Sequence, residues 1–431
     1  MDSVAFFTFR PLATVAVFLT TLVLVLKRPW RLHEAWAALI GSFLMLALGL
    51  EAPEQAWNTV LQGKDVLLFL LALMIFSALI DQTGFFEWAA IHAAKAAKGS
   101  GRALFRNVFL VGAAITALLS LDTTAIILTP IVMSFINRLK LEPRPFLLAC
   151  AFVSNTGSLL LPVSNLTNLL FQSAFDIPFV SFTLHMALAQ IVVIALNYWI
   201  MFHLFKSSLP EKYDDDLPEP SSVIKDETFF RSALIVLLLV LIGYFAASQV
   251  HVPPYIIASI GCVILFVCGL SRKRLDVPKL HKDIDWTLFP FVIGLFVVMR
   301  AVENLGLAKS LAAGLKSVGD GLLPQITINA FANAIGSNLI NNIPMALLSI
   351  SVIKEFHASG FASQFGALLG CNLGPNITVT GSLATMLVIA SARKRGANVS
   401  AQDFFKAGIK ITPLLLLAGS VVLWAVCSVF Q

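Results

Sequence analysis

Apolar stretches of about 20 residues recur along almost the whole chain, and they constrain the fold more than any other feature of the sequence. A helix of that length crosses the hydrocarbon core of a bilayer, where the backbone must satisfy its own hydrogen bonds. Hydrophobic residues make up 58% of the chain and charged residues only 13%, which is atypical of a soluble globular protein. The sequence therefore predicts an all-α polytopic membrane protein embedded in the lipid bilayer, without a separate soluble domain.

The net charge of +6 arises from short basic clusters between the apolar stretches, so it does not indicate a partner nucleic acid. These clusters lie at 27–31, 95–106, 272–274 and 393–395. Basic loops are retained on the cytoplasmic side of a membrane. With the clusters inside, we expect a bacterial inner (cytoplasmic) membrane protein whose two termini are both periplasmic. The first apolar stretch is interpreted as a retained span, not as a cleaved signal peptide.

About ten transmembrane spans are compatible with this orientation. They are predicted near 10–27, 33–50, 66–80, 145–170, 183–204, 231–249, 254–271, 285–301, 360–391 and 407–429. Two further apolar blocks, 107–138 and 323–353, must enter and leave on the same side, and are predicted to be re-entrant helical hairpins. The five cysteines all lie in apolar segments without CxxC spacing, so we expect no disulfide, no metal site and no cofactor.

The two halves of the sequence resemble each other at an offset of about 220 residues. "KDVLLFLLALMIFSALIDQTGFF" from residue 64 pairs with "IDWTLFPFVIGLFVVMRAVENLGLA" from residue 284, and each is followed by an amphipathic segment with lysines, including Lys309 and Lys316 in the second. "SNTGSLLLPVSNLTNLL" (154–170) pairs with "CNLGPNITVTGSLATML" (371–387), which aligns Asn155 with Asn372. Five crossings separate the matched elements, so the two repeats are predicted to have inverted topology.

This comparison predicts three parts. The first half, 1–205, contains scaffold spans, the hairpin 107–138 and the broken helix 145–170. A polar cytoplasmic linker follows at 206–230, and its acidic residues Asp214, Asp215 and Asp216 are interpreted as solvated surface. The second half, 231–431, contains further scaffold spans, the hairpin 323–353 and the broken helix 360–391.

Matched helices interrupted by Gly, Pro and Asn indicate a transport site near the midplane of the membrane. The blocks 107–137, 145–175, 321–353 and 360–392 contain one charged residue between them, Asp122, which is the candidate for proton coupling. The candidate substrate-binding residues are otherwise neutral: Thr123, Thr124, Ser154, Asn155, Thr156, Asn165, Asn338, Asn341, Asn342, Cys371, Asn372, Asn376 and Thr378. Such a set favours a small uncharged polyol-like solute, or a cation, over a multivalent anion that needs arginines.

Structural roles remain open for each of these residues. Asp122 is also a suitable cap for a helix starting at Thr123. The Asn, Ser and Thr side chains are also typical of interhelical hydrogen bonds in membranes. Cys371 is either a small packing residue or a ligand for a soft ion.

Four segments resemble signature segments of the arsenite/antimonite efflux permeases, the ArsB family of the ion transporter superfamily: "LDTTAIILTPIV", "VSNTGSLLLPVSNLTNLL", "GSNLINNIPMALL" and "NLGPNITVTGSLATML". The resemblance covers essentially the whole chain. It implies a secondary active transporter that exports trivalent arsenic and antimony in exchange for protons and confers resistance. It also implies optional coupling to a soluble arsenite-stimulated ATPase subunit and, by analogy, a homodimer formed through the scaffold. Arsenite at neutral pH is mostly an uncharged trihydroxide, which suits the neutral site.

Other functions remain as alternatives. The hairpin tips "LDTT" and "INNI" differ from the Ser-Asn-Thr tips of related sodium-coupled dicarboxylate carriers, which favours protons over sodium. A sodium/proton antiporter or a sodium-coupled organic-anion carrier of the same superfamily is the nearest alternative. A membrane-embedded enzyme is remote, since the chain has no HExxH, GxGD or DDxxD motif. A passive channel fits inverted, broken repeats less well than alternating access.

Overall fold

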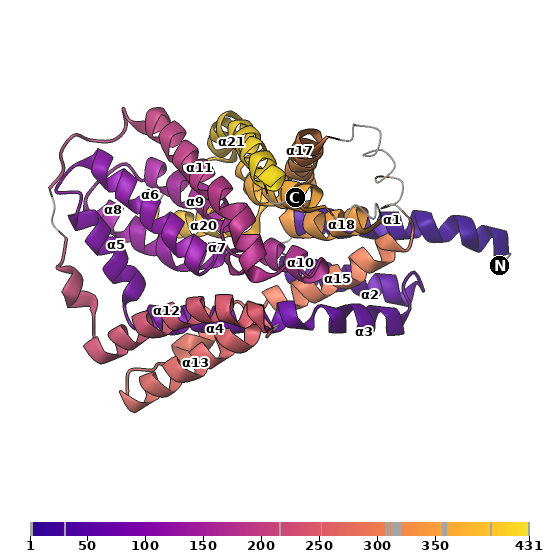
Figure 1. Cartoon of the computed structure of the whole chain (residues 1–431), viewed down its shortest axis with the longest axis horizontal. Coiled ribbons are helices and arrows are strands. Elements are labelled where there is room, and N and C mark those ends of the chain that lie inside the picture. The colour runs from indigo at the N-terminus through magenta and orange to yellow at the C-terminus, as the bar shows by residue number, and fades with distance from the viewer. Residues whose placement is uncertain are drawn as a thin grey trace.

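The computed structural model describes residues 3–29, 32–214, 217–250, 252–306, 308, 311, 321–355, 360–396 and 399–429. Within these ranges the chain consists of helices joined by turns and short loops, with no β-strand (Figure 1). Lys309, Lys316, Asp215 and Asp216 lie outside the described residues.

The helices follow the same order in both halves of the chain. The first half contains α1 (Ser3–Lys27), α2 (Glu34–Ala47), α3 (Pro53–Gln62), α4 (Lys64–Gln82), α5 (Phe85–Lys95), α6 (Gly101–Leu118), α7 (Leu121–Thr123), the π-helical η2 (Thr124–Leu128), α8 (Thr129–Arg138), α9 (Pro143–Thr156), η3 (Gly157–Leu159), η4 (Pro162–Ser164), α10 (Leu166–Ala174) and α11 (Phe179–Phe205). After η5 (Pro220–Val223), the second half contains α12 (Glu227–Gln249), α13 (Pro254–Ser271), α14 (Val277–Asp283), α15 (Leu288–Glu303), α17 (Leu322–Ile340), α18 (Asn342–Glu355), α19 (Phe361–Leu373), η6 (Gly374–Asn376), η7 (Val379–Gly381), α20 (Leu383–Lys394) and α21 (Ala401–Val429). By order, α4 corresponds to α15, α6 to α17, α9 to α19, α10 to α20 and α11 to α21.

Eight helices among the described residues are long and apolar enough to cross a membrane. Seven coincide with predicted spans, and the eighth, α6, is the first arm of the predicted hairpin 107–138. The span predicted at 33–50 is the shorter helix α2, and those predicted over 145–170 and 360–391 are broken. The prediction of an all-α polytopic membrane protein is therefore confirmed. The re-entrant course of the hairpins and the inverted orientation of the repeats stay predictions.

The two broken helices are interrupted at the residues expected from the sequence. Each has a pair of 3₁₀ turns between its halves, and Pro162 begins the second turn of the first break. The next half-helix is capped in the same way on both sides. Thr167 N donates to Asn165 Oδ1 at 3.1 Å, and Thr385 N donates to Ser382 Oγ at 3.1 Å. Such caps satisfy the free N–H groups of a helix start, which have no water to bond in a membrane.

Polar residues also form the turns between the arms of the predicted hairpins. Ser120 caps α7, because its Oγ accepts from Thr123 N at 3.1 Å. Asn341 separates α17 from α18 with φ at +75°, a left-handed conformation that Asn tolerates better than most residues, and its Oδ1 accepts from Ile343 N at 3.3 Å. Both turns therefore bring side-chain polar groups into an apolar environment.

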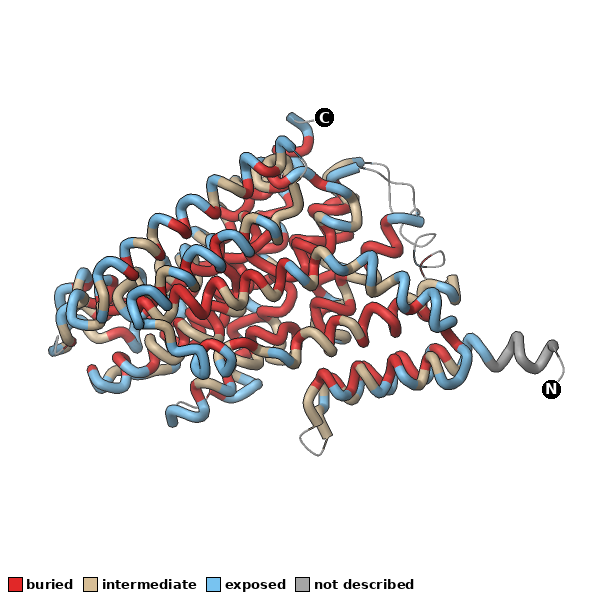
Figure 2. The backbone as a smooth tube through the Cα atoms, turned by 90° about the horizontal axis from the view of Figure 1, so that it is seen from below, coloured by how far each residue is buried: buried red, intermediate tan, exposed pale blue. Residues whose placement is uncertain are grey.

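Each half of the molecule packs against the hairpin arms of the other. The half-helix α10 contacts α18, whereas α20 contacts η2 and α8. Outside this central unit, α4 packs on α13 and α15 packs on α2. Buried residues run through the interior where these elements meet (Figure 2). The central elements of both halves therefore form one continuous core.

The linker between the halves lies against the first half. Tyr213 N donates to Gly99 O at 2.8 Å, Gly101 N donates to Pro210 O at 3.1 Å, and Lys95 pairs with Glu219. Gly99 has φ at +76°, which favours glycine, and its Cα faces the carbonyl of Tyr213. The linker is thus held across α5 and the start of α6.

Asp226 fixes the start of α12 at the end of this linker. Its Oδ1 accepts from Phe229 N at 2.8 Å, and its Oδ2 lies 3.2 Å from Arg272 at the end of α13. The N–H of Phe229 and the guanidinium of Arg272 together hold the pKa of Asp226 below its usual value.

Candidate functional site

The two broken helices cross at their central asparagines. Asn155, near the end of α9, is fully buried, and its Nδ2 donates to Asn376 Oδ1 and to Thr385 Oγ1, each at 2.9 Å. Its Oδ1 accepts from Ser382 Oγ at 3.1 Å. All three partners belong to the second half, so the side chain of Asn155 joins the first broken helix to the second.

Asn372 makes the reverse set of contacts. It is fully buried near the end of α19, and its Oδ1 accepts from Thr167 Oγ1 at 2.9 Å and from Asn165 Nδ2. Its Nδ2 donates to Asn168 Oδ1 at 2.7 Å. Here every partner belongs to the first half.

The two sets of partners match in sequence. Asn165 follows Asn155 at the same spacing as Ser382 follows Asn372. Asn168 and Thr385 are likewise equally spaced from Asn155 and Asn372. We call this set the asparagine crossing; it comprises Asn155, Asn165, Thr167, Asn168, Asn372, Asn376, Ser382 and Thr385. It contains no charged side chain and is almost completely buried. Its reciprocal bonds support the predicted twofold repeat.

The second predicted hairpin is tied to the second break by amide groups. Asn338 Nδ2 donates to Gly374 O at 2.7 Å, and its Oδ1 accepts from both Thr378 N and Thr378 Oγ1, at 2.9 and 2.7 Å. Asn341 Nδ2 donates to Thr380 O at 3.1 Å. Asn338, Asn341 and Thr378 therefore hold irregular backbone in place.

A chain of hydroxyl groups holds the tip of the first predicted hairpin. Thr124 Oγ1 lies 2.7 Å from Thr116 Oγ1, which joins the two arms. Thr123 Oγ1 lies 2.9 Å from Ser120 Oγ and 2.9 Å from Ser77 Oγ on α4. The tip is thereby bound to a helix of the expected scaffold.

Asp122 lies on this side of the tip. Its side chain is half-buried and has no hydrogen bond or ion pair within the described part of the chain. It lines a cavity of about 30 Å³ together with Ser77, Ser120 and Thr123, and Asp283 at the end of α14 lines the same cavity. The carboxylate of Asp122 thus faces α4 and α14, whereas the asparagine crossing joins α9 and α10 to α19 and α20.

Other predicted site residues form hydrogen bonds outside the crossing. Ser154 Oγ donates to Ala151 O at 2.9 Å within its own helix, and Thr156 Oγ1 donates to Phe152 O at 2.8 Å. Cys371 Sγ lies 3.4 Å from Asn333 Oδ1 on α17. No group of three His, Cys, Asp or Glu side chains suited to a metal ion occurs among the residues that the structure describes.

The structure therefore brings Asn155, Asn165, Asn372 and Asn376 together and leaves Asp122 at a separate cavity. It also adds residues that the sequence did not single out. Asn168 and Thr385 complete the crossing, and their signal was present, because each follows a helix-capping residue by three positions, about one turn. Ser77 and Asp283 carried no local signal.

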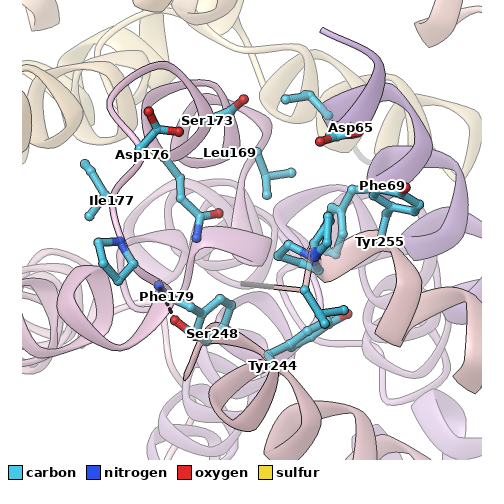
Figure 3. A pocket seen from close by; sticks show the side chains of 16 residues that line it. Asp65, Phe69, Leu169, Ser173, Asp176, Ile177, Phe179, Tyr244, Ser248 and Tyr255 are labelled. Atoms are coloured by element: carbon cyan, nitrogen blue, oxygen red, sulfur yellow. Dashed lines mark hydrogen bonds between the residues drawn. The ribbon is translucent and has the colours of Figure 1, made fainter. Parts of the chain in front are cut away.

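A larger cavity of about 490 Å³ lies between the central unit and the helices around it (Figure 3). Asp65 of α4 and Asp176, in the loop before α11, line this cavity, and so do Tyr244 and Tyr255 of α12 and α13. Leu169, which follows Asn168 of the crossing, also lines it. In the predicted orientation this cavity lies on the periplasmic side, and it is large enough for a small solute and its water.

Comparison with known proteins identifies the family. Residues 13–426 match the family described as "Arsenical pump membrane protein" (ArsB). The chain belongs to this family. The match spans both broken helices, both predicted hairpins and Asp122, so the candidate site lies wholly within it.

Curated relatives agree with the assignment. The arsenical pump membrane protein of Escherichia coli strain K12 is 34% identical over 415 residues, which cover 93% of this chain and 96% of the relative. The arsenical pump membrane protein of Yersinia enterocolitica has the same identity and coverage. A 46 kDa membrane protein of Mycobacterium leprae is 26% identical over 423 residues, or 95% of this chain and 97% of the relative. The first two relatives are named as membrane pumps and not as enzymes, and the chain is a transporter.

Two solved structures share the fold. The Alcanivorax borkumensis YdaH transporter matches with a TM-score of 0.60 at 15% identity, covering 96% of this chain and 98% of that chain. Neisseria gonorrhoeae MtrF matches with a TM-score of 0.55 at 13% identity, covering 95% and 94% of the two chains. At these identities the likeness concerns the fold alone.

Proposed function

We propose that this member of the arsenical pump family exports trivalent arsenic and antimony from the cytoplasm as neutral trihydroxides, in exchange for protons, and thereby confers resistance to arsenite and antimonite. Asp122 carries the exchanged proton. The carboxylate is charged in one half of the cycle and neutral in the other, so it is the group through which a proton gradient drives the movement of an uncharged solute.

The observation that carries this proposal is the environment of Asp122. A carboxylate inside an apolar segment is costly and marks function by default. The alternative role as a helix cap is filled by Ser120, whose Oγ accepts from Thr123 N. Asp122 instead lines a small cavity of mixed apolar and polar side chains and makes no hydrogen bond or ion pair with the described residues. A group in this position is available to bind and release a proton.

Two buried amide atoms support a neutral, hydroxyl-bearing substrate. Asn342 Oδ1 and Asn376 Nδ2 have no hydrogen-bond partner within the described ranges. A buried polar atom without a partner costs about 1–3 kcal/mol, which a bound solute can recover. One of these atoms accepts and the other donates, and a trihydroxide offers O–H groups and oxygen lone pairs to match. We infer that these two amides contact the solute, whereas Asn155 and Asn372 position the broken helices.

The predicted orientation extends the proposal. We place the protein in the bacterial inner membrane with both termini periplasmic, so the cavity beside Asp65 and Asp176 becomes the exit towards the periplasm. A homodimer through the scaffold and an arsenite-stimulated ATPase subunit remain predictions of the family resemblance. Sodium coupling is the competing proposal, and the hairpin tips "LDTT" and "INNI", which differ from the Ser-Asn-Thr tips of sodium-coupled carriers, favour protons.

Uptake of arsenite and antimonite into everted vesicles tests the proposal. With the lumen acidic and no ATP present, the wild-type protein accumulates both solutes, and replacing sodium with choline leaves uptake unchanged. Asp122→Asn keeps exchange of labelled for unlabelled arsenite but does not accumulate it. Accumulation that requires sodium, or that persists in Asp122→Asn, would refute proton coupling through Asp122.

A resistance assay tests the substrate class. An efflux-deficient host that expresses the chain grows in arsenite and antimonite but gains no protection from arsenate, because the asparagine crossing has no arginine to bind an anion. Equal protection against arsenate would contradict a neutral substrate. Asn342→Ala and Asn376→Ala are expected to raise the arsenite concentration needed for half-maximal uptake.

A further inference from the structure

The cavity at Asp122 contains a second carboxylate. Asp283, the last residue of α14, lines the same space of about 30 Å³ as Asp122, and so do Ser77 and Thr123. The volume of about 30 Å³ is the space open to the centre of a water molecule, so the cavity has room for at least one water, and such a water needs two to four polar partners. The two carboxylates and the hydroxyls supply them.

Asp283 also reaches solvent. Its side chain is 30% exposed, yet its Oδ2 is buried and accepts no hydrogen bond from the described residues. Oδ2 lies 3.9 Å from Lys279 Nζ, which in turn lies 2.8 Å from Asp81 Oδ2 at the end of α4. The carboxylate of Asp283 therefore lines the cavity of Asp122 and also borders the exposed surface beside α14.

Other charged groups near the cavity are already engaged. Asp276 caps the start of α14, where its Oδ1 accepts from Lys279 N at 2.9 Å. Asp285 accepts from Thr287 N at 3.1 Å. Among Asp81, Asp276, Asp283 and Asp285, only Asp283 lines the cavity.

We propose that Asp283 is the residue that passes protons between Asp122 and the cytoplasmic solution. The inference rests on the proposed proton exchange. Neutral Asp122 gives its proton to a water in the shared cavity, and that water gives a proton to the carboxylate of Asp283. Asp122 is left ionised, and Asp283 then releases the proton to solvent on its exposed side. The predicted orientation places the end of α14 on the cytoplasmic side, where the antiporter has to release the proton.

A purely structural role makes a different prediction. Asp283 and Asp81 share Lys279, so loss of either carboxylate loosens the attachment of α14 to α4. Asp81 has the shorter contact with Lys279 and does not line the cavity. Asp81→Asn is therefore the matched control, because it perturbs the same ion cluster and leaves both carboxylates of the cavity in place.

The test compares two modes of transport in everted vesicles. Accumulation driven by an acidic lumen requires a proton to cross, whereas exchange of labelled for unlabelled arsenite does not. Asp283→Asn is expected to slow accumulation at least about tenfold while exchange stays within about twofold, since loss of a proton-transfer group typically costs a hundredfold or more. Asp81→Asn is expected to leave both rates within about twofold, as for other surface ion pairs. Asp283→Glu is expected to restore accumulation with a shifted pH profile.

Each outcome decides the matter. Normal accumulation by Asp283→Asn overturns the inference. The inference is also overturned if Asp283→Asn and Asp81→Asn both lose accumulation and exchange to the same extent, because that result indicates that Asp283 only attaches α14 to α4. If Asp283→Asn does not fold, Asp283→Glu carries the test, and an unchanged pH profile counts against the inference. Failure of the proposed function itself is separate, because wild-type vesicles would then show no accumulation driven by the pH gradient.

Discussion

Removing the amide of Asn155 gives the most direct measure of the asparagine crossing. Asn155→Ala deletes three hydrogen bonds between the halves, to Asn376, Thr385 and Ser382. Interhelical hydrogen bonds in membranes contribute about 0.6 kcal/mol on average and up to about 1.7 kcal/mol. Three of them give about 2 to 5 kcal/mol. Ser382 Oγ already lies 3.3 Å from Thr385 Oγ1, so these two partly satisfy each other, and we expect a loss of about 2 to 4 kcal/mol.

Unfolding in mixed micelles, followed by tryptophan fluorescence, measures this loss. Asn329→Ala is the matched control, because its amide makes one bond within its own helix, to Gln325 O, and should cost less than about 1 kcal/mol. A double-mutant cycle sharpens the result. Asn155→Ala and Thr385→Ala should be non-additive, whereas Asn155→Ala and Asn329→Ala should be nearly additive, since the side chain of Asn329 shares no partner with Asn155. Equal costs for Asn155→Ala and Asn329→Ala would refute the reasoning.

Three further predictions follow from the fold. Cysteine labelling should find residues near Lys273 accessible from the cytoplasm and residues near Glu54 from the periplasm; the reverse result would remove the predicted inverted topology. Gly408→Ala should abolish transport, because its Cβ would lie 2.1 Å from a backbone oxygen in the second break, whereas Gly360→Ala, with open space around it, should transport normally. The pKa of Asp226 is lower in the folded protein than in the unfolded chain, so ionised Asp226 stabilises the fold at pH values above the unfolded pKa. This contribution is lost as the pH falls through the folded pKa. The thermal unfolding temperatures of Asp226→Asn and wild type in detergent should therefore differ at neutral pH and converge in strong acid.

The sequence predicts the breaks well because they depend on local chemistry. Pro162 removes a backbone donor, and Asn165 and Ser382 are suitable caps, so the interruption of each helix is readable from a few residues. The pairing of Asn155 with Asn372 follows from comparison of the halves. The sequence does not predict that these amides bond the two helices to each other and not to a common ligand. The geometry of a crossing between distant segments is set by packing.

The cavity at Asp122 shows the same limit. The charge of Asp122 within an apolar run is visible in the sequence, and its cost at membrane depth is enough to predict a function. Asp283 belongs to a short polar helix with two lysines and a histidine, which resembles an ordinary membrane-surface segment. Only the packing of α14 against α4 brings its carboxylate to the hairpin tip. Residues that act through tertiary proximity alone leave no pattern in their own neighbourhood.

The crossing and the carboxylate differ in symmetry, and this difference bears on the direction of transport. Asn155 and Asn372 bond to matching partners, so under the predicted inverted topology the crossing offers similar neutral groups to both sides of the membrane. Asp122 has no counterpart, because the second tip reads "LINNIP" and carries amides instead of a carboxylate. An uncharged solute gains nothing from the membrane potential, and a symmetric neutral site gives it no preferred side. Under the proposed exchange, the driving force therefore enters through the one element that breaks the symmetry, the hairpin tip with Asp122.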